Sequence, residues 1–216
     1  MKSEQKEMKI DWRKRFFLLC GINALILILL AIYLYSPIPS KQFEIKQDQW
    51  NKKTGSEFLI RTSKQNLNDL VNAYLDKLLT NTEEDFTVLL EEDVQLYGEL
   101  PFFSTTVPLQ VHFDPVVQPN GDIALKQKSI AVGLLELPNQ KVMQYIDRYL
   151  PTPEWVIVDP KEEEIYVKIT EMNIKSNLEV KVEQFDLESN NIAIRLQVPY
   201  KTLGIDVMEQ LNEEQN

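Results

Sequence analysis

One uncharged segment constrains this chain more than any other feature. It reads FFLLCGINALILILLAIYLY and covers the 20 residues Phe16–Tyr35. As an α-helix rising about 1.5 Å per residue, it would be about 30 Å long, which is the thickness of the hydrocarbon core of a bilayer. Its many Leu, Ile and Phe side chains outweigh the cost of the single polar Asn23. The sequence therefore predicts a transmembrane helix that contacts the lipid bilayer through Phe16–Tyr35.

The charges that flank this segment predict its orientation. Met1–Arg15 carries a net charge of +3, so the remainder carries −13 of the total of −10. Basic residues next to a transmembrane helix stay in the cytoplasm, which places the N-terminus inside and the acidic body outside a plasma membrane. A cleavable signal peptide has a shorter apolar run and small residues at its exit, whereas this run is longer and leads into YSPIPS. The pattern favours an uncleaved single-pass anchor.

Several classes of binding site are excluded for the body. An acidic surface repels nucleic acid phosphates, so we expect no nucleic acid partner. The six glycines are too scattered for a phosphate-binding loop. Cys20 is the only cysteine and His112 the only histidine, which leaves no disulfide and no ordinary zinc site. We expect neither a metal nor a cofactor.

The composition divides the chain into five parts. We expect a cytoplasmic basic tail over residues 1–15, the anchor over 16–35 and a proline-containing tether over 36–57. An extracytoplasmic α+β domain is expected over 58–203, followed by a polar and frayed tail over 204–216.

Two amphipathic helices are predicted in the body. The first follows Ser63, its predicted N-cap, and carries one apolar stripe. The stripe consists of Leu67, Leu70, Val71, Tyr74, Leu75, Leu78 and Leu79. The second covers NQKVMQYIDRYL, with Asn139 as its cap, and ends before Pro151.

Alternating apolar residues predict antiparallel strands in the rest of the body. These patterns start near Phe86, Val94, Val107, Ile123, Trp155, Ile165, Leu178 and Ile192. Asn120-Gly121 predicts a tight hairpin, and a change of phase predicts a bulge near Gln127–Ser129. The predicted fold class is α+β: a curved antiparallel sheet of two meanders, packed with two helices and preceded by one transmembrane helix.

His112 raises the question of catalysis. In a strand it shares the polar face with Asp114, yet no second histidine and no GxSxG motif accompany it. A histidine on a solvated sheet face is the favoured interpretation, and a hydrolase centred on His112 ranks third among the functions considered. The acidic runs at Glu91–Asp93 and Lys161–Glu164 lack the spacing and the turn glycine of a calcium loop, so we interpret them as solvated surface.

Apolar residues on consecutive strand positions exceed what one face of a sheet needs. Neighbours in a strand point to opposite faces, so burial on both faces is one interpretation and a hydrophobic binding surface is the other. The candidates for binding a hydrophobic ligand or a partner are Phe102, Phe103, Val132, Leu134 and Trp155.

Five segments together resemble the YpmS family of single-pass envelope proteins of Gram-positive bacteria. They are the anchor ending in SP, KQNLNDLVNAYL, FDPVVQPNGDIALKQKSIAVGLLELP, LPTPEWV and VKVEQFDL, between about Phe16 and Val198. The family has no established function, so the resemblance implies an anchored envelope protein and no catalytic residues.

These observations favour a membrane-anchored, non-enzymatic domain that binds a lipid, a cell-wall precursor or another hydrophobic ligand. The alternative is a scaffold that binds an envelope protein through a sheet edge or through the Phe102–Phe103 region.

Overall fold

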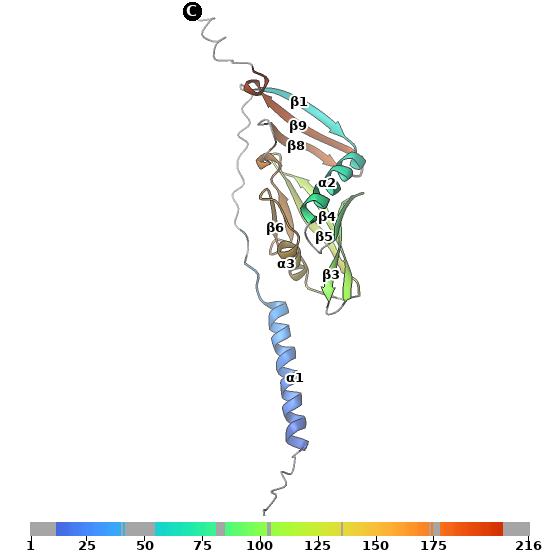
Figure 1. The fold of residues 1–216 in the computed structure, drawn as a ribbon, viewed down its shortest axis with the longest axis vertical. Helices are drawn as coiled ribbons and strands as arrows, with labels where there is room; N and C mark the ends of the chain where they lie inside the picture. Colours follow the sequence, from blue (N-terminus) through green and yellow to red (C-terminus); the bar gives the residue numbers. More distant parts are fainter. Residues whose placement is uncertain are drawn as a thin grey trace, which may run out of the picture. The chain divides into compact units, whose positions relative to one another are not determined.

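A computed structural model describes residues 12–39, 41, 55–80, 85–102, 105–134, 136–172, 174 and 178–204. The chain forms two compact units, Met1–Pro37 and Ile38–Asn216. Figure 1 shows the ribbon coloured along the sequence. The expected cytoplasmic tail, and all of the expected C-terminal tail except Gly204, lie outside the described residues.

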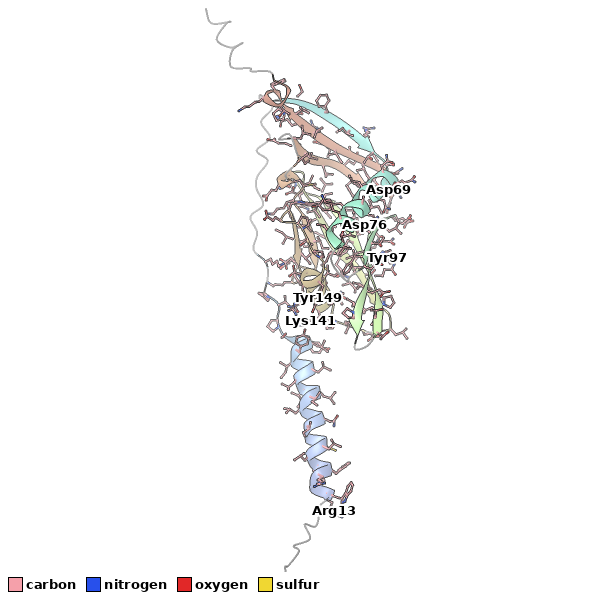
Figure 2. The ribbon with its side chains drawn as sticks, viewed as in Figure 1. Arg13, Asp69, Asp76, Tyr97, Lys141 and Tyr149 are labelled. Carbon is pink, nitrogen blue, oxygen red and sulfur yellow. The ribbon has the colours of Figure 1, made fainter. Side chains whose placement is uncertain are left out.

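The first unit contains one long helix, α1 (Trp12–Tyr35). Its segment Arg15–Tyr35 has a mean hydropathy of 2.7 and is long and apolar enough to span a membrane. Side chains project on all sides of α1, and Arg13 lies at its N-terminal end (Figure 2). The Asn23 amide donates to the Leu19 carbonyl at 3.2 Å, so its polar group has a partner within the helix. The sequence prediction of one candidate transmembrane helix is confirmed.

The second unit is built on a six-stranded antiparallel sheet. Its spatial order is β2-β3-β4-β5-β7-β6. The strands are β2 (Phe86–Leu90), β3 (Val94–Phe102), β4 (Thr105–Val117), β5 (Ile123–Val132), β6 (Val156–Asp159) and β7 (Glu164–Val167). The first four form the meander that the alternating residues predict.

A second sheet joins the two ends of the body. It has the order β1-β9-β8, all antiparallel, and consists of β1 (Gly55–Thr62), β8 (Glu179–Asp186) and β9 (Asn191–Pro199). The short helices η1 (Ile169–Glu171) and η2 (Tyr200–Leu203) flank β8 and β9 in sequence. The fold class is confirmed, but the second predicted meander is divided, because β6 and β7 join the first sheet.

Two helices cover one face of the six-stranded sheet. α2 (Lys64–Leu79) lies against β2, and α3 (Asn139–Tyr149) lies against β6. One hydrophobic core unites Leu75 of α2 and Met143 and Ile146 of α3 with inward-facing strand residues such as Val111 and Phe113. The helices and the sheet therefore enclose a single core, as amphipathic elements require.

The Asn120-Gly121 turn is present and fastens the two sheets together. Gly121 has φ +94°, and its carbonyl accepts from Val182 N–H of β8 at 2.8 Å. The buried Asp122 carboxylate accepts from Tyr166 Oη at 3.2 Å and from Thr170 Oγ1 at 2.9 Å. Burial, and next to it the charge of Asp122, raise the pKa of Tyr166 to about 12, so the phenol remains a donor at neutral pH.

The predicted bulge is also confirmed. His112 pairs with Ser129, but Phe113 pairs with Gln127, so Lys128 has no directly opposed partner in β4. An extra residue of this kind bends the strand locally. It accounts for the change of phase seen in the sequence.

The first helix buries less of its stripe than predicted. Ser63 caps α2 as expected, with Asn66 N–H donating to its hydroxyl at 3.3 Å. However, Leu75 is the buried residue of the helix, whereas Leu70 is 66% exposed. The reason is that α2 lies at the margin of the sheet, over its edge strand β2.

The predicted cap of the second helix is wrong. Pro138 occupies the N-cap position of α3, and no side chain caps the helix. Asn139 is already helical, and its amide points to Glu163 Oε2 at 3.5 Å. Proline at this point fixes the backbone at φ −58° and lets its carbonyl accept from Val142 N–H at 3.3 Å.

Parts of the expected tether belong to the body. β1 begins at Gly55, three residues before the expected boundary. Earlier in the chain, Lys41 N–H donates to the Asp159 carboxylate at 3.2 Å, and the Lys41 ammonium pairs with Asp147 of α3. Residues 42–54 lie outside the described residues.

Candidate functional site

A group of polar side chains surrounds His112 on the outer face of the six-stranded sheet. In β3 and β4 the inward positions are apolar, so the alternate positions face away from the core. The register pairs Gln95 with His112 and Tyr97 with Gln110. Asp93, one residue before β3, continues the same outward series. Directly opposed side chains lie on one face, which brings these five residues together.

The five side chains form a closed ring of hydrogen bonds. Gln95 Nε2 donates to Asp93 Oδ1 at 2.9 Å, and Tyr97 Oη donates to Gln95 Oε1 at 2.7 Å. Gln110 Nε2 lies 2.9 Å from Tyr97 Oη and 2.8 Å from His112 Nε2. His112 Nδ1, 3.0 Å from Asp93 Oδ2, closes the ring.

The ring selects one tautomer of His112. The two amide hydrogens of Gln110 are donated to the Tyr97 hydroxyl and to His112 Nε2, so Nε2 must accept. The proton of the neutral imidazole is then on Nδ1, where it is donated to the Asp93 carboxylate. A proton on Nε2 would face the amide donor of Gln110. The hydrogen bonds therefore fix the orientation of the His112 imidazole.

Lys128 connects the ring to Asp114. Its ammonium lies 3.5 Å from Asp93 Oδ2 and 3.4 Å from Asp114 Oδ1. Burial raises the pKa of Asp93, but hydrogen bonds from Gln95 and His112 and the charges of His112 and Lys128 outweigh it, so this pKa lies below its ordinary value. Asp114 itself bonds Lys128, and its role as the partner of His112 is taken by Asp93.

In this geometry the polar atoms of His112 and Asp93 are engaged by neighbouring side chains. Both ring nitrogens of His112 and both Asp93 oxygens have side-chain partners. A general base needs a nitrogen within reach of the proton that it removes, and here Nε2 is engaged by Gln110. Within the described ranges, no group of three or more His, Cys, Asp and Glu side chains is placed to hold a metal ion.

Sequence reasoning missed Asp93 as the partner of His112. Asp93 is 6% exposed, although the acidic run that contains it was interpreted as solvated surface. The signal was available: Asp93, Gln95 and Tyr97 share one strand phase, and pairing that strand with the next one places them beside His112.

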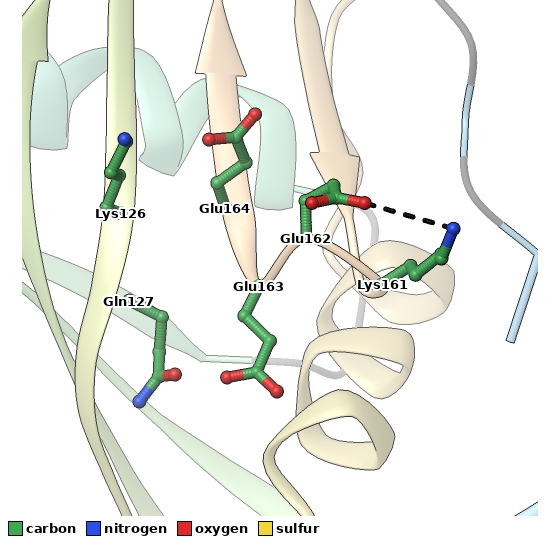
Figure 3. Close-up of a pocket in the computed structure, with 6 residues that line it drawn as sticks. All are labelled: Lys126, Gln127, Lys161, Glu162, Glu163 and Glu164. Carbon is green, nitrogen blue, oxygen red and sulfur yellow. Dashed lines mark ion pairs between the residues drawn. The ribbon is translucent and has the colours of Figure 1, made fainter. Parts of the chain in front are cut away.

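A pocket of about 380 Å³ lies at the second acidic run. Figure 3 shows its lining: Lys126 and Gln127 of β5, and Lys161, Glu162, Glu163 and Glu164 of the β6–β7 hairpin. Burial raises the pKa of Glu164, against the opposing charge of Lys126. Lys161 and Glu162 form an ion pair at 3.9 Å. A lining of charged and amide groups does not suit a hydrocarbon chain.

The apolar candidates that the structure describes lie in different environments. Val132 is buried in the core opposite Leu109, and Leu134 is fully exposed just beyond it. The backbone of Phe102 ends β3, whereas its side chain and Phe103 lie outside the described residues.

Trp155 lies at the opposite end of the six-stranded sheet. Its neighbour in sequence, Val156, pairs with Val167. Val167 pairs on its other side with Ile123, at the start of β5. Its ring contacts Tyr74 of α2, with ring centroids 5.7 Å apart. The structure therefore separates Trp155 from Phe102, Val132 and Leu134.

The three-stranded sheet has an apolar face that sequence reasoning did not identify. This face consists of three rows of directly opposed residues. The first row is Phe185 and Ile192, and the second is Val182, Ile194 and Ile60. The last row is Val180, Leu196 and Phe58. The first row belongs to the core. The last row is open to solvent, since Phe58 is 51% exposed.

The opposite face of this sheet is mainly polar, with Leu59 and the buried Ala193 as apolar residues. Arg195 pairs with Glu57 at 2.8 Å and also with Glu183, which lowers the pKa of Glu183. Leu59 lies beside them and is 55% exposed. β1 was missed because its first residues were assigned to the tether, although FLIRT is rich in residues that favour strands.

The comparisons with known proteins agree with the resemblance seen in the sequence. A family described as "Uncharacterized protein conserved in bacteria (DUF2140)" matches residues 11–198. "Uncharacterized protein YpmS" of Bacillus subtilis (strain 168) is 30% identical over 182 residues, which cover 84% of this chain and 94% of that protein. No solved structure matches the chain. The chain belongs to the DUF2140 family of uncharacterised bacterial proteins, together with its relative YpmS.

Proposed function

We propose that this protein is a single-pass membrane protein whose body lies outside the cytoplasm and binds the apolar part of an envelope lipid or cell-wall precursor without chemically changing it. The supporting observation is the apolar face of the β1-β9-β8 sheet, which continues beyond the core. An anchored protein of this kind would hold such a ligand close to the bilayer or present it to a partner enzyme.

The apolar face has the character that a hydrocarbon ligand requires. Phe58 and Ile60 of β1 are 51% and 47% exposed, and their neighbours Leu196 and Ile194 are half-buried. Covering such side chains contributes roughly 25 cal/mol per Å² of apolar surface removed from water. The face is continuous with the core through Ile192, so it is a firm surface and not a mobile loop.

The surroundings of His112 support a binding role over catalysis. Each polar atom of the ring that would act on a substrate already has a partner inside the protein. Replacing His112 by Ala should leave ligand binding in place, since the ring lies on the six-stranded sheet and the apolar face on the three-stranded one. If cells that carry His112→Ala at normal protein levels lost the function of the protein, the hydrolase hypothesis would instead be favoured.

Lipid extraction tests the proposal directly. The second compact unit, secreted without α1 and purified without detergent, is extracted with organic solvent and its lipids are identified by mass spectrometry. We expect a near-stoichiometric lipid that is absent from an unrelated domain prepared in parallel. An empty, folded body would contradict the proposal.

A matched pair of variants localises the binding. Phe58→Glu places a charge on the apolar face and should abolish lipid retention. Leu59→Glu is the control, because Leu59 is equally exposed but lies on the opposite face. Equal loss in both variants would show that the apolar face is not the binding surface.

A second candidate function is assembly with a protein partner. The observation that favours it is the position of β1 at the edge of its sheet, where an extended segment of a partner can add a strand.

A further inference from the structure

The outer edge of β1 is an unusual surface for a protein to leave open. β1 is the terminal strand of its sheet, and within the described residues nothing pairs with its outer side. Its central residues Phe58, Leu59 and Ile60 are each about half-exposed, at 51%, 55% and 47%. Edge strands normally avoid association by being short, charged or bulged. β1 is eight residues long and keeps an uninterrupted register with β9.

The sequence of β1 is complementary to itself when it is reversed. In GSEFLIRT, Glu57 and Arg61 are equidistant from Leu59, and so are Phe58 and Ile60. Antiparallel pairing of two such strands about Leu59 places Glu57 of each copy opposite Arg61 of the other. It also places Phe58 opposite Ile60 and Leu59 opposite Leu59. Opposite charges and apolar pairs in these positions stabilise a sheet, whereas like charges would destabilise it.

The ionic state of the two charged residues fits this pairing. Arg61 is exposed and has no ion pair in the part of the chain that the structure describes. Glu57 already pairs with Arg195 at 2.8 Å, and that same arginine is shared with Glu183. Lys181, opposite Arg195 in the register, is a second cation of this cluster. Arg61 of a second copy would add an ion pair at Glu57, the carboxylate of the cluster that lies on β1 itself.

We propose that β1 pairs antiparallel with β1 of a second copy of this chain, about a two-fold axis at Leu59. The two three-stranded sheets then form one sheet of six strands. Because this register places Phe58 of one copy opposite Ile60 of the other, the apolar faces of both copies lie on the same side of that sheet. An isologous contact of this kind closes after two copies. The proposal deepens the second candidate function and is independent of ligand binding.

Membrane anchoring makes a second copy a favourable occupant. Two chains held in one bilayer meet at a higher effective concentration than free proteins do. A modest interface at β1 therefore suffices, and no partner of another kind is needed to complete the edge.

Site-directed disulfide formation tests the pairing in the full-length chain. Cys20→Ser removes the only native cysteine, and Leu59→Cys then places one thiol on the proposed axis. Directly opposed residues in antiparallel strands have Cα atoms about 4.5–5.5 Å apart, which is within the range of a disulfide. We expect mild oxidation of native membranes to convert Leu59→Cys to a covalent dimer.

The control is Leu70→Cys in the same background, because Leu70 is also largely exposed but lies on α2. It reports random collision in the membrane. Cross-linking of Leu59→Cys that does not exceed that of Leu70→Cys would overturn the proposal.

The charge pairs provide a second test. Arg61→Glu, added to Leu59→Cys, places carboxylates opposite each other twice and should lower cross-linking at least about fivefold, whereas Arg61→Lys should retain it. Unchanged cross-linking in Arg61→Glu would overturn the proposed register. Lipid retention by the Arg61→Glu body should be normal, since Arg61 does not lie on the apolar face; the failure of dimerisation and the failure of ligand binding are thus separable.

Discussion

At the scale of single residues, the ring around His112 depends on the direction of every hydrogen bond in it. Tyr97 must donate to Gln95 because it accepts from Gln110, and His112 must donate to Asp93 because its other nitrogen accepts. A change at one member therefore affects all five. Fully satisfied polar networks of this kind make the local structure rigid and specify one arrangement of its side chains.

Asp93→Asn is the substitution that tests this interdependence. It removes the charge that both His112 and Lys128 approach, and we expect it to lower the free energy of unfolding by about 1–3 kcal/mol at pH 7. Asp114→Asn is the matched control, because Asp114 contacts the same lysine but is 59% exposed; it should cost less than about 1 kcal/mol. Urea unfolding of the detergent-solubilised chain, followed by tryptophan fluorescence, measures both.

The pH dependence of the Asp93→Asn effect has a definite sign. Because the folded-state pKa of Asp93 is below its ordinary value of 3.8, ionised Asp93 stabilises the fold above that value. The contribution is lost as the pH falls through the folded-state pKa. The difference between the native chain and Asp93→Asn should thus shrink below about pH 4. A difference that grows on acidification would show that the carboxylate is not stabilised in the fold.

Residue-level patterns predicted part of this site and not the rest. The strand alternation placed His112 on the polar face of a sheet, because that argument needs only the period of the apolar residues. The alternation put Asp114 on the same face but did not identify Asp93 as the partner of His112, since the neighbour of a residue across strands depends on register. Register is set here by the hairpin between β3 and β4, whose tip the sequence does not define.

At the scale of elements, α2 covers the sheet edge that β2 would otherwise expose. Asn72 makes two hydrogen bonds with the backbone of Val88, at 2.7 and 2.9 Å, and Asn68 accepts from Leu90 N–H at 3.1 Å. Two asparagines one helical turn apart thus replace a neighbouring strand. The predicted apolar stripe does not include these asparagines, so it describes only part of the contact: α2 satisfies polar backbone groups as well as burying Leu75.

Asn72→Ala should therefore destabilise the body by about 2–3 kcal/mol, since it leaves two backbone groups of β2 without their partner. Asn66→Ala, on the exposed side of the same helix, controls for the change in helix propensity and should cost less than about 1 kcal/mol. Thermal unfolding of both variants measures the difference. Equal stabilities would show that water replaces the asparagine at the edge of β2.

The Asn120-Gly121 turn is the element that the sequence predicted best, because its backbone requirement is local. Its second role is not local. A Cβ atom at Gly121 would lie 2.3 Å from Lys181 Cβ of β8, so the turn also needs glycine to approach the other sheet. The sequence around the turn does not indicate that Gly121 lies against Lys181 of the other sheet.

Gly121→Ala separates these two requirements. Both Gly121 and Gly204 have positive φ, +94° and +72°, but a Cβ at Gly204 meets nothing within 4 Å. We expect Gly204→Ala to cost about 1 kcal/mol, from backbone strain alone, and Gly121→Ala to cost at least about 2 kcal/mol more, from overpacking against Lys181. If both substitutions lowered the free energy of unfolding by similar amounts in urea, the contact between Gly121 and Lys181 would not contribute to stability.

At the scale of the whole molecule, the chain combines an apolar helix, long enough to span a membrane, with an acidic remainder. Helix α1 lies in a compact unit of its own, and the segment that follows is joined to the body at Lys41 through Asp159. The length and composition of the apolar run predicted a candidate membrane-spanning helix, and α1 has both properties. The two-sheet arrangement was not predictable in the same way, because β1 and β9 pair although they are the first and the last strand in the sequence.

The orientation of the anchor is the last prediction. Because the N-terminal flank carries +3 and the remainder −13, we expect the N-terminus in the cytoplasm and the body outside. In a Cys20→Ser background, Leu134→Cys, which is fully exposed on the body, should react with a membrane-impermeant maleimide in intact cells. Lys2→Cys should react only after the membrane is permeabilised, because it remains inside. The reverse pattern would invert the topology, and a mature chain that begins after Tyr35 would identify the apolar segment as a cleaved signal sequence.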